Sequence, residues 1–288
     1  CFFFIADIHS LTTHYNNTEN IKENSIYMII DWLSAGLNHK KCTIFMQSDI
    51  KETFELYSIL SMVTPLGLLE RIPSFKDNNN INLKTLGFLG YPVLQGADIL
   101  ILNGDYVPIG IDQIPHLELI KEIAKKFNNI YNNKILNIPE PILSTHNKIF
   151  GIDGNKMSKS NNNTILISDN IEMIKKKIIM TKTDSNRIHT YIKGNPEKCT
   201  IWKLHEVYSN GSEQEYISNS CKNAEIGCVE CKKILYSKII KEQIPILKNI
   251  KKNENKNMFI QKIINKGEKK VSAIAKKNIE NIKKNIKL

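Results

Sequence analysis

The strongest constraint on the fold is a repeated order of short apolar segments and amphipathic helices in the first half of the chain. The apolar segments cover residues 1–7, 42–49 and 96–103, and helical periodicity covers residues 19–37, 51–63 and 116–127. Strands that alternate with helices predict an α/β protein in which helices cover both faces of a parallel sheet. Ligands of such sheets bind beyond the carboxyl ends of the strands.

The pattern changes near residue 168, where strand signals fade and helical periodicity takes over. The last helical stretch carries apolar residues at a helical period, namely Val271, Ile274, Ala275, Ile279, Ile282 and Ile286. A chain of 288 residues is long enough for two domains. We therefore expect a parallel-sheet domain over residues 1–168 and an all-helical domain over residues 169–288.

The charge of the chain favours a polyanionic partner. The formal net charge is +11, and nearly all the positive charge is lysine, because Arg71 and Arg187 are the only arginines. Lysine, asparagine and isoleucine have AT-rich codons, so this composition reflects the genome and does not by itself define a binding surface. No apolar run is long enough to span a membrane, and we expect no membrane association.

Four of the six cysteines cluster in the last third of the chain, at Cys199, Cys221, Cys228 and Cys231. Four thiolates from one chain can hold a zinc ion or a 4Fe–4S cluster. A zinc ribbon usually offers two C-x2-C pairs and this chain has one, which favours the cluster over zinc. The remaining alternative is four buried cysteines without a metal. Cys1 and Cys42 lie in apolar segments and are expected in the core.

Two loops have the composition of ligand-binding loops. The turn "GIDQ" at 110–113 places a glycine at the head of a helix, where exposed backbone N–H groups attract anions. The loop "GNKMSKSNNN" at 154–163 holds two lysines among small side chains and is suited to contact an anionic group.

Five segments in order give the sequence a specific resemblance. "LLERIPSFKD", "YPVLQGADIL", "GIDQIPHLELIKEIAKKFN", "KMSKS" and "TKTDSN" resemble segments of the tryptophanyl-tRNA synthetases, class I enzymes of the bacterial and organellar type. A single KMSKS is a weak signal, but five family segments in order are not chance. The resemblance runs over essentially the whole chain. It implies a Rossmann-like catalytic domain, an anticodon-binding helical domain and tryptophan–tRNA ligase activity.

The resemblance assigns an ATP site. Lys156 and Lys159 match lysines that stabilise the charge on the leaving pyrophosphate, and positive charge placed there lowers the barrier. ATP, with Mg²⁺, is the implied substrate. The other matching nucleotide positions are Lys76, Gly110, Ile111, Asp112, Gln113, Ile149, Met157, Ser158 and Ser160.

The resemblance also assigns a tryptophan pocket. Asp98 matches the residue that accepts the indole N–H, and a buried carboxylate there would reject phenylalanine because the acid would be left unpaired. The other matching positions are His9, Tyr91, Gln95, Val107, Ile109 and Gln113.

Two further features bear on the resemblance. A subset of the family holds a 4Fe–4S cluster with almost the same cysteine spacing, which supports the cluster assignment. The first strand and the HIGH-like phosphate motif of class I synthetases are absent from the sequence. We therefore expect an N-terminally truncated chain that does not activate an amino acid at useful rates.

Two alternatives remain open from the sequence. A tyrosine–tRNA ligase shares a Gln-x-x-Asp pattern, although "YPV" before Gln95 argues against it, and a non-catalytic tRNA-binding paralogue would also fit. The expected partners are L-tryptophan, tRNA(Trp) and a second copy in a homodimer. The expected location is a plastid (apicoplast) or mitochondrion of an AT-rich eukaryote, with a bacterial cytoplasm as the alternative.

Overall fold

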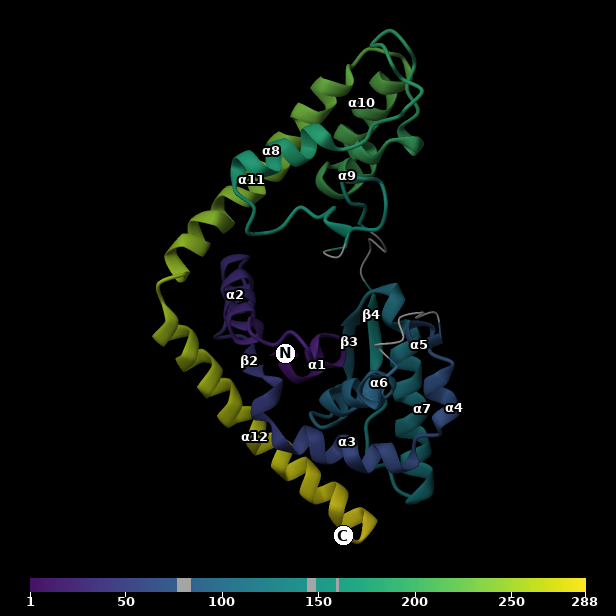
Figure 1. The fold of residues 1–288 in the computed structure, drawn as a ribbon, viewed down its shortest axis with the longest axis vertical. Helices are drawn as coiled ribbons and strands as arrows, with labels where there is room; N and C mark the ends of the chain where they lie inside the picture. The colour runs from purple at the N-terminus through teal and green to yellow at the C-terminus, as the bar shows by residue number, and fades with distance from the viewer. Residues whose placement is uncertain (77–83, 144–148, 159–160) are drawn as a thin grey trace. The chain divides into compact units, whose positions relative to one another are not determined.

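A computed structural model describes residues 1–76, 84–143, 149–158 and 161–288 (Figure 1). The chain forms two compact units. The first comprises residues 1–30, 37–145 and 256–288, and the second comprises residues 31–36 and 146–255. Among the described residues, no helix is long and apolar enough to cross a membrane.

The first unit holds the strands and the helices that pack on them. Its strands are β1 (Phe2–Ile5), β2 (Thr43–Met46), β3 (Tyr106–Ile109) and β4 (Glu140–Leu143). Its helices are α1 (Asp7–His14), most of α2 (Ile21–Ser34), α3 (Lys51–Val63), α4 (Leu66–Glu70), α5 (Pro73–Lys76), α6 (Leu86–Leu100), α7 (Ile114–Ile130) and α12 (Asn257–Ile286). Short 3-10 turns, η1 (Gln47–Asp49) and η3 (Ile111–Gln113), follow β2 and β3.

The strands pair in parallel, as predicted. β1 pairs with β2 in the register Phe2 with Thr43, and β3 pairs with β4 in the register Tyr106 with Glu140. Parallel neighbours need a crossover between them, and α1 and α2 supply it for the first pair. The α/β prediction is confirmed, and the carboxyl ends of β1 and β2 lie side by side.

One predicted strand is wrong. Residues 96–103 form the end of α6 and the turn after it, and the strand lies later, at Tyr106–Ile109. α6 starts at Thr85, whose side chain accepts a hydrogen bond from the Phe88 N–H at 3.1 Å. Most of α6 is buried, and a helix buried on nearly all sides carries an unbroken apolar run that periodicity does not distinguish from a buried strand.

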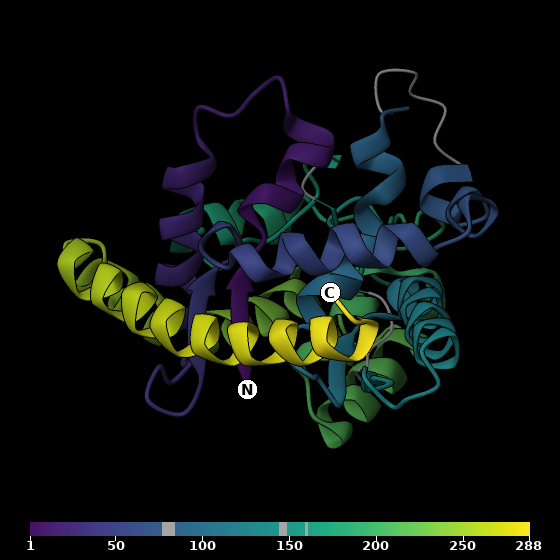
Figure 2. The same cartoon turned by 90° about the horizontal axis from the view of Figure 1, so that it is seen from below.

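The core of the first unit joins α12 to the rest of the unit. Leu56 of α3, Leu100 of α6, Phe127 of α7 and Val271 of α12 belong to one buried cluster. α12 packs along β2 and α3, as Figure 2 shows. The two compact units thus differ in extent from residues 1–168 and 169–288. The reason is that the apolar stripe of α12 is buried on the first unit.

The second unit is helical. Its helices are α8 (Ile171–Met180), α9 (Thr200–Tyr208), α10 (Gly211–Lys222) and α11 (Cys228–Asn253), with a short 3-10 turn, η5 (Pro196–Lys198). Ile174 and Ile178 of α8 pack with Leu204 of α9 and Leu235 of α11 in a small buried core. The predicted change to helical structure after residue 168 is confirmed.

Candidate functional site

A polar cavity of about 350 Å³ lies in the first unit, beyond the carboxyl end of β1. Its lining residues are Phe4, Ala6, His9, Tyr91, Gln95, Asp98, Gln113 and His116. The cavity brings together five of the residues that the sequence assigns to a tryptophan pocket, namely His9, Tyr91, Gln95, Asp98 and Gln113. Val107 and Ile109 of β3 are partly buried and pack on the core, and they are not among its lining residues.

One face of α6 supplies three of the lining side chains. Tyr91, Gln95 and Asp98 are spaced by four and three residues, so a helix places them one above another. A strand at 96–103 would have left Gln95 and Tyr91 outside it. The correction of this element from strand to helix therefore explains how the three side chains reach one cavity.

Asp98 is a buried acid held by an amide. It is 7% exposed, and Gln47 Nε2 donates to its Oδ1 at 2.9 Å and to its Oδ2 at 2.8 Å. The pKa of Asp98 is raised to about 8: burial raises it most, the Gln47 hydrogen bonds lower it, and the nearby charge of Asp7 raises it. At neutral pH the carboxyl group is therefore largely protonated before a ligand binds.

A hydrogen-bond network orders the other side of the cavity. His116 Nε2 lies 3.0 Å from the Tyr91 hydroxyl and 3.2 Å from the Ser74 hydroxyl, and these two hydroxyls are also bonded to each other. His116 Nδ1 lies 3.1 Å from Gln113 Oε1, which accepts only, so Nδ1 carries the proton. Burial lowers the pKa of His116, which keeps the ring neutral with Nε2 as an acceptor.

His9 faces the same cavity from α1. Its ring contacts Tyr91 edge to face at 5.3 Å between centroids, and its backbone N–H donates to Gln47 Oε1 at 2.9 Å. Burial lowers the pKa of His9, and the nearby His116 lowers it further. Both histidines therefore present neutral rings at neutral pH.

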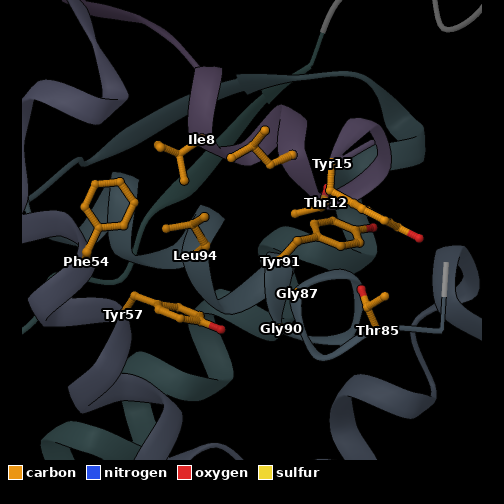
Figure 3. Close-up of a pocket in the computed structure, with 11 residues that line it drawn as sticks. Ile8, Thr12, Tyr15, Phe54, Tyr57, Thr85, Gly87, Gly90, Tyr91 and Leu94 are labelled. Atoms are coloured by element: carbon orange, nitrogen blue, oxygen red, sulfur yellow. The ribbon is translucent and has the colours of Figure 1, made fainter. Parts of the chain in front are cut away.

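Tyr91 also lines a second cavity. This apolar space of about 370 Å³ lies between α1, α3 and α6, and its lining includes Ile8, Phe54, Tyr57 and Leu94 (Figure 3). A Cβ atom at Gly90 would approach the Tyr57 hydroxyl to 2.5 Å, so glycine lets the Tyr57 side chain lie close against α6. Tyr91 thus lines both the apolar cavity and the polar one.

The "GIDQ" residues form the predicted turn before α7. Gly110 precedes η3, which contains Ile111, Asp112 and Gln113. A Cβ atom at Gly110 would lie 2.7 Å from Asp112 Oδ1, so glycine allows the carboxylate to fold back over the turn. Lys76, the last residue of α5, is exposed in the same unit.

The KMSKS segment belongs to the second unit. The Met157 N–H donates to the Ile149 carbonyl at 2.9 Å, and Lys156 forms a β-bridge with Phe150. Buried Asn163 accepts from the Ser158 N–H at 2.7 Å and donates to the Lys156 carbonyl at 3.1 Å. Lys159 and Ser160 lie outside the described residues. The described part of the loop is thus ordered by backbone bonds and by the side chains of Asp153, Asn155 and Asn163.

Comparisons with known proteins agree on the family. A sequence model described as tRNA synthetases class I (W and Y) matches residues 1–242. The tryptophan–tRNA ligase of Thermotoga maritima is 38% identical over 100% of this chain and 89% of that protein. The chain belongs to the class I tRNA synthetases, among the tryptophan–tRNA ligases.

Further relatives agree with this membership. The tryptophan–tRNA ligase of Ralstonia nicotianae is 35% identical, covering 93% of this chain and 85% of that protein. The structure resembles the tryptophanyl-tRNA synthetase of Campylobacter jejuni complexed with ADP and tryptophan, with a TM-score of 0.85 and 33% identity. The match covers 99% of this chain and 89% of the other. The predicted Rossmann-like fold and the predicted enzyme class are confirmed.

In this synthetase the four clustered cysteines share one neighbourhood of the second unit. Cys199 precedes α9, Cys221 lies in the last turn of α10, and Cys228 and Cys231 lie in the first turn of α11. Burial and, to a smaller extent, the other three thiols together raise the pKa of Cys231 to about 12. Among the described residues, however, no group of three or more His, Cys, Asp or Glu side chains is arranged to hold a metal ion. The thiols are neighbours without being assembled as ligands.

Sequence reasoning missed three polar residues in and around the cavity. His116 lines it, and the side chains of Gln47 and Ser74 bond to the lining residues Asp98 and Tyr91. Gln47 lies near the end of the segment 42–49 that was predicted as a strand, and a polar residue at the carboxyl end of a parallel strand was a usable signal. His116 lies on the apolar face of α7, which is more typical of a core position. Ser74 had no local signal, because α5 brings it to the cavity only in the folded chain.

Proposed function

We propose that the polar cavity binds the side chain of L-tryptophan, and that tryptophan–tRNA ligation is the reaction that this cavity serves. The main support for this proposal is Asp98, a buried hydrogen-bond acceptor in a cavity that the aromatic residues Phe4, His9 and Tyr91 also line. An indole offers an apolar body and one N–H donor, which fits an aromatic cavity with one buried carboxyl. Binding an analogue without the N–H would leave the buried acid unpaired.

The proposed reaction has two steps. A carboxylate oxygen of tryptophan attacks the α-phosphorus of ATP, the bond to the β-phosphate oxygen breaks, and pyrophosphate leaves with Mg²⁺. A terminal ribose hydroxyl of tRNA(Trp) then attacks the carbonyl of tryptophanyl-adenylate, and AMP leaves. Lys156, and Lys159 beyond the described residues, carry positive charge to the departing pyrophosphate.

The remaining nucleotide roles rest on the family match. Gly110 and Asp112 are proposed to hold the ribose, because the turn places an exposed carboxylate next to the start of α7. Lys76, Ile149, Met157 and Ser158 are proposed to contact the nucleotide. Residues 1–168 are proposed as the catalytic domain and residues 169–288 as the anticodon-binding domain.

The decisive experiment is a calorimetric titration of the protein with L-tryptophan, L-tyrosine and L-phenylalanine. We expect tryptophan to bind at one site and the other two at least a hundredfold more weakly, a selectivity of about 2.7 kcal/mol. Selective binding of tyrosine would instead support the tyrosine–tRNA ligase. Absence of selective binding would overturn the proposed pocket and favour the non-catalytic paralogue.

A 4Fe–4S cluster on the four cysteines is also proposed, with zinc as the alternative. Four thiolates match the donor set of such a cluster, and the site has compensating positive charge. Arg187 Nη1 donates to Cys221 Sγ at 3.6 Å, and Cys228 and Cys231 lie at the N-terminus of α11, whose dipole favours negative charge. When bound, the cluster would tie α9, α10 and α11 together. The thiols would have to move to reach it, because no three of the described His, Cys, Asp or Glu side chains are arranged to hold a metal ion.

The remaining proposals concern partners and location. tRNA(Trp) follows from the reaction, and the net charge of +11 supports a polyanionic partner. A homodimer is proposed from the family resemblance, and light scattering of the purified protein tests it. An organellar location rests on the AT-rich composition, whereas the bacterial origin of the relatives from Thermotoga maritima and Aquifex aeolicus favours a bacterial cytoplasm.

A further inference from the structure

Gln47 is a fully buried amide between two elements of the cavity. It is 1% exposed and lies in η1, directly after β2. Its Oε1 accepts from the His9 backbone N–H at 2.9 Å, and its Nε2 lies 2.9 and 2.8 Å from the two carboxyl oxygens of Asp98. The carbonyl end faces a donor and the amino end faces acceptors, so the orientation of the amide is determined.

The two contacts to Asp98 constrain how that carboxyl group is presented. A carboxyl on a helix can rotate about its terminal torsion, which is broad and nearly two-fold. In the ionised form, one nitrogen bonded to both oxygens restricts the rotation of the group and occupies one acceptor position on each oxygen. The remaining lone pairs are then available to the cavity, which Asp98 lines together with Tyr91 and Gln95.

The backbone of α1 holds Gln47 in turn. The His9 N–H belongs to a main-chain group that cannot rotate freely, so the Gln47 carbonyl is anchored to a fixed donor. Gln47 therefore connects the start of α1, the end of β2 and the acid on α6. A site side chain is held in place by a supporting residue that is itself fixed by the fold, and Gln47 meets this condition for Asp98.

We propose that Gln47 is a positioning residue that orients the Asp98 carboxyl toward the indole N–H and so sets the preference for tryptophan over an indole analogue without a donor. The inference rests on the proposed role of Asp98. It goes beyond that role because it assigns selectivity to a residue that does not itself line the cavity.

Among the described residues, the groups that shift the pKa of Asp98 include no positive charge, so the neutral amide of Gln47 is the group that orients its carboxyl. Asp7 is the nearby acid, and its charge raises the pKa of Asp98. His9 and His116 face the cavity as neutral rings because burial lowers the pKa of each, and burial raises the pKa of Tyr91. The hydrogen bonds from Gln47 are the contribution that lowers the pKa of Asp98. Loss of the amide is therefore expected to raise that pKa further.

The test compares two ligands on four proteins. The ligands are L-tryptophan and its isostere in which sulfur replaces the indole N–H, and binding is measured by calorimetry. The proteins are wild type, Gln47→Met, Asp98→Ala and Gln243→Met, the last a matched control for loss of a buried glutamine, because Gln243 donates to the Ile167 carbonyl in the second unit. We expect wild type and Gln243→Met to prefer tryptophan, and Gln47→Met to lose about tenfold of that preference with unchanged binding of the isostere.

Each outcome decides one question. If wild type shows no preference for tryptophan over the isostere, the proposed role of Asp98 fails. If Asp98→Ala loses the preference but Gln47→Met keeps it, the role of Asp98 stands and the positioning role of Gln47 is overturned. Equal weakening of both ligands by Gln47→Met would also overturn it, because that result would show a general structural defect.

A second variant and a second measurement keep the test decisive if Gln47→Met does not fold. Gln47→Asn keeps the amide but withdraws it by one methylene, and we expect the same loss of preference for tryptophan. The pH midpoint of tryptophan binding should also move upward in Gln47→Met and Gln47→Asn, because the bonds that favour the ionised carboxyl are lost. An unchanged midpoint in a folded variant would contradict the proposal.

Discussion

The Gln47 side-chain amide bonds both carboxyl oxygens of Asp98 across 51 positions of sequence. This contact joins the end of β2 to α6 and places an acid of raised pKa at the base of the cavity. The protonation state of Asp98 connects the stability of the fold to the proposed binding of an indole N–H. The first two predictions follow from it.

The affinity for tryptophan should rise as the pH rises from 6 to about 8. The pKa of Asp98 is raised to about 8, chiefly by burial, so the ligand-free carboxyl is mainly protonated at pH 6. The indole N–H donates most strongly to the ionised form, so ionisation favours binding. Calorimetric titrations at several pH values measure the trend. Asp98→Asn should bind tryptophan with a flat pH profile, and a flat profile in wild type would contradict the assignment.

The same acid should make the fold less stable as the pH rises. The unfolded-state pKa is the ordinary 3.8 and the folded-state pKa is about 8, so the stability contribution is fully present below pH 3.8 and is lost as the pH rises through 8. Relative to Asp98→Asn, the wild-type free energy of unfolding should fall by at most about 1.4 kcal/mol per pH unit over this range. Urea denaturation of both proteins at each pH measures the difference. A difference that does not change with pH would show that Asp98 is already ionised.

Replacing Gly267 by alanine should loosen α12 from β2. A Cβ atom at Gly267 would lie 1.8 Å from the Ile44 carbonyl oxygen, so the helix must shift. We expect a loss of about 1–3 kcal/mol in the free energy of unfolding, although alanine is the better helix former. The matched control is Gly67→Ala in α4 of the same unit, where no atom lies within 4 Å of the added Cβ. Equal effects of the two substitutions would refute the close approach.

Lys156→Ala should slow adenylate formation without weakening tryptophan binding. A positive charge at the leaving pyrophosphate acts mainly in the transition state, so its loss should lower the rate of tryptophan-dependent ATP–pyrophosphate exchange about a hundredfold. Lys176→Ala, on the exposed face of α8, controls for loss of one lysine from the same unit. A rate equal to wild type would remove Lys156 from the proposed catalytic group.

The cysteine cluster should hold about four irons per chain after anaerobic purification. The double variant Cys228→Ser, Cys231→Ser should lose the iron and the brown colour, whereas Cys42→Ser should keep both. Because the pKa of Cys231 is raised to about 12, metal binding must release a proton from this thiol and should strengthen as the pH rises. Stoichiometric zinc would keep the site and reject the cluster, and no metal would reject both.

Local sequence was enough for the elements whose signal is local. The helix predicted over 51–63 is α3, Lys51–Val63, and the segments 1–7 and 42–49 contain β1 and β2. Such segments are short, periodic and bounded by polar residues, so propensity and burial agree. Segment 96–103 was predicted wrongly, because an apolar run buried on all sides has no period that separates strand from helix.

The sequence by itself determined the family and the chemistry of the candidate residues, because the order of five segments and the side-chain types are properties of the chain alone. It also determined that Tyr91, Gln95 and Asp98 share a face, once the segment is helical. Only the tertiary structure decided that Gln47 reaches Asp98 and that the His9 N–H reaches Gln47. Those contacts join residues tens of positions apart, and they exist because two parallel strands end side by side next to a buried helix.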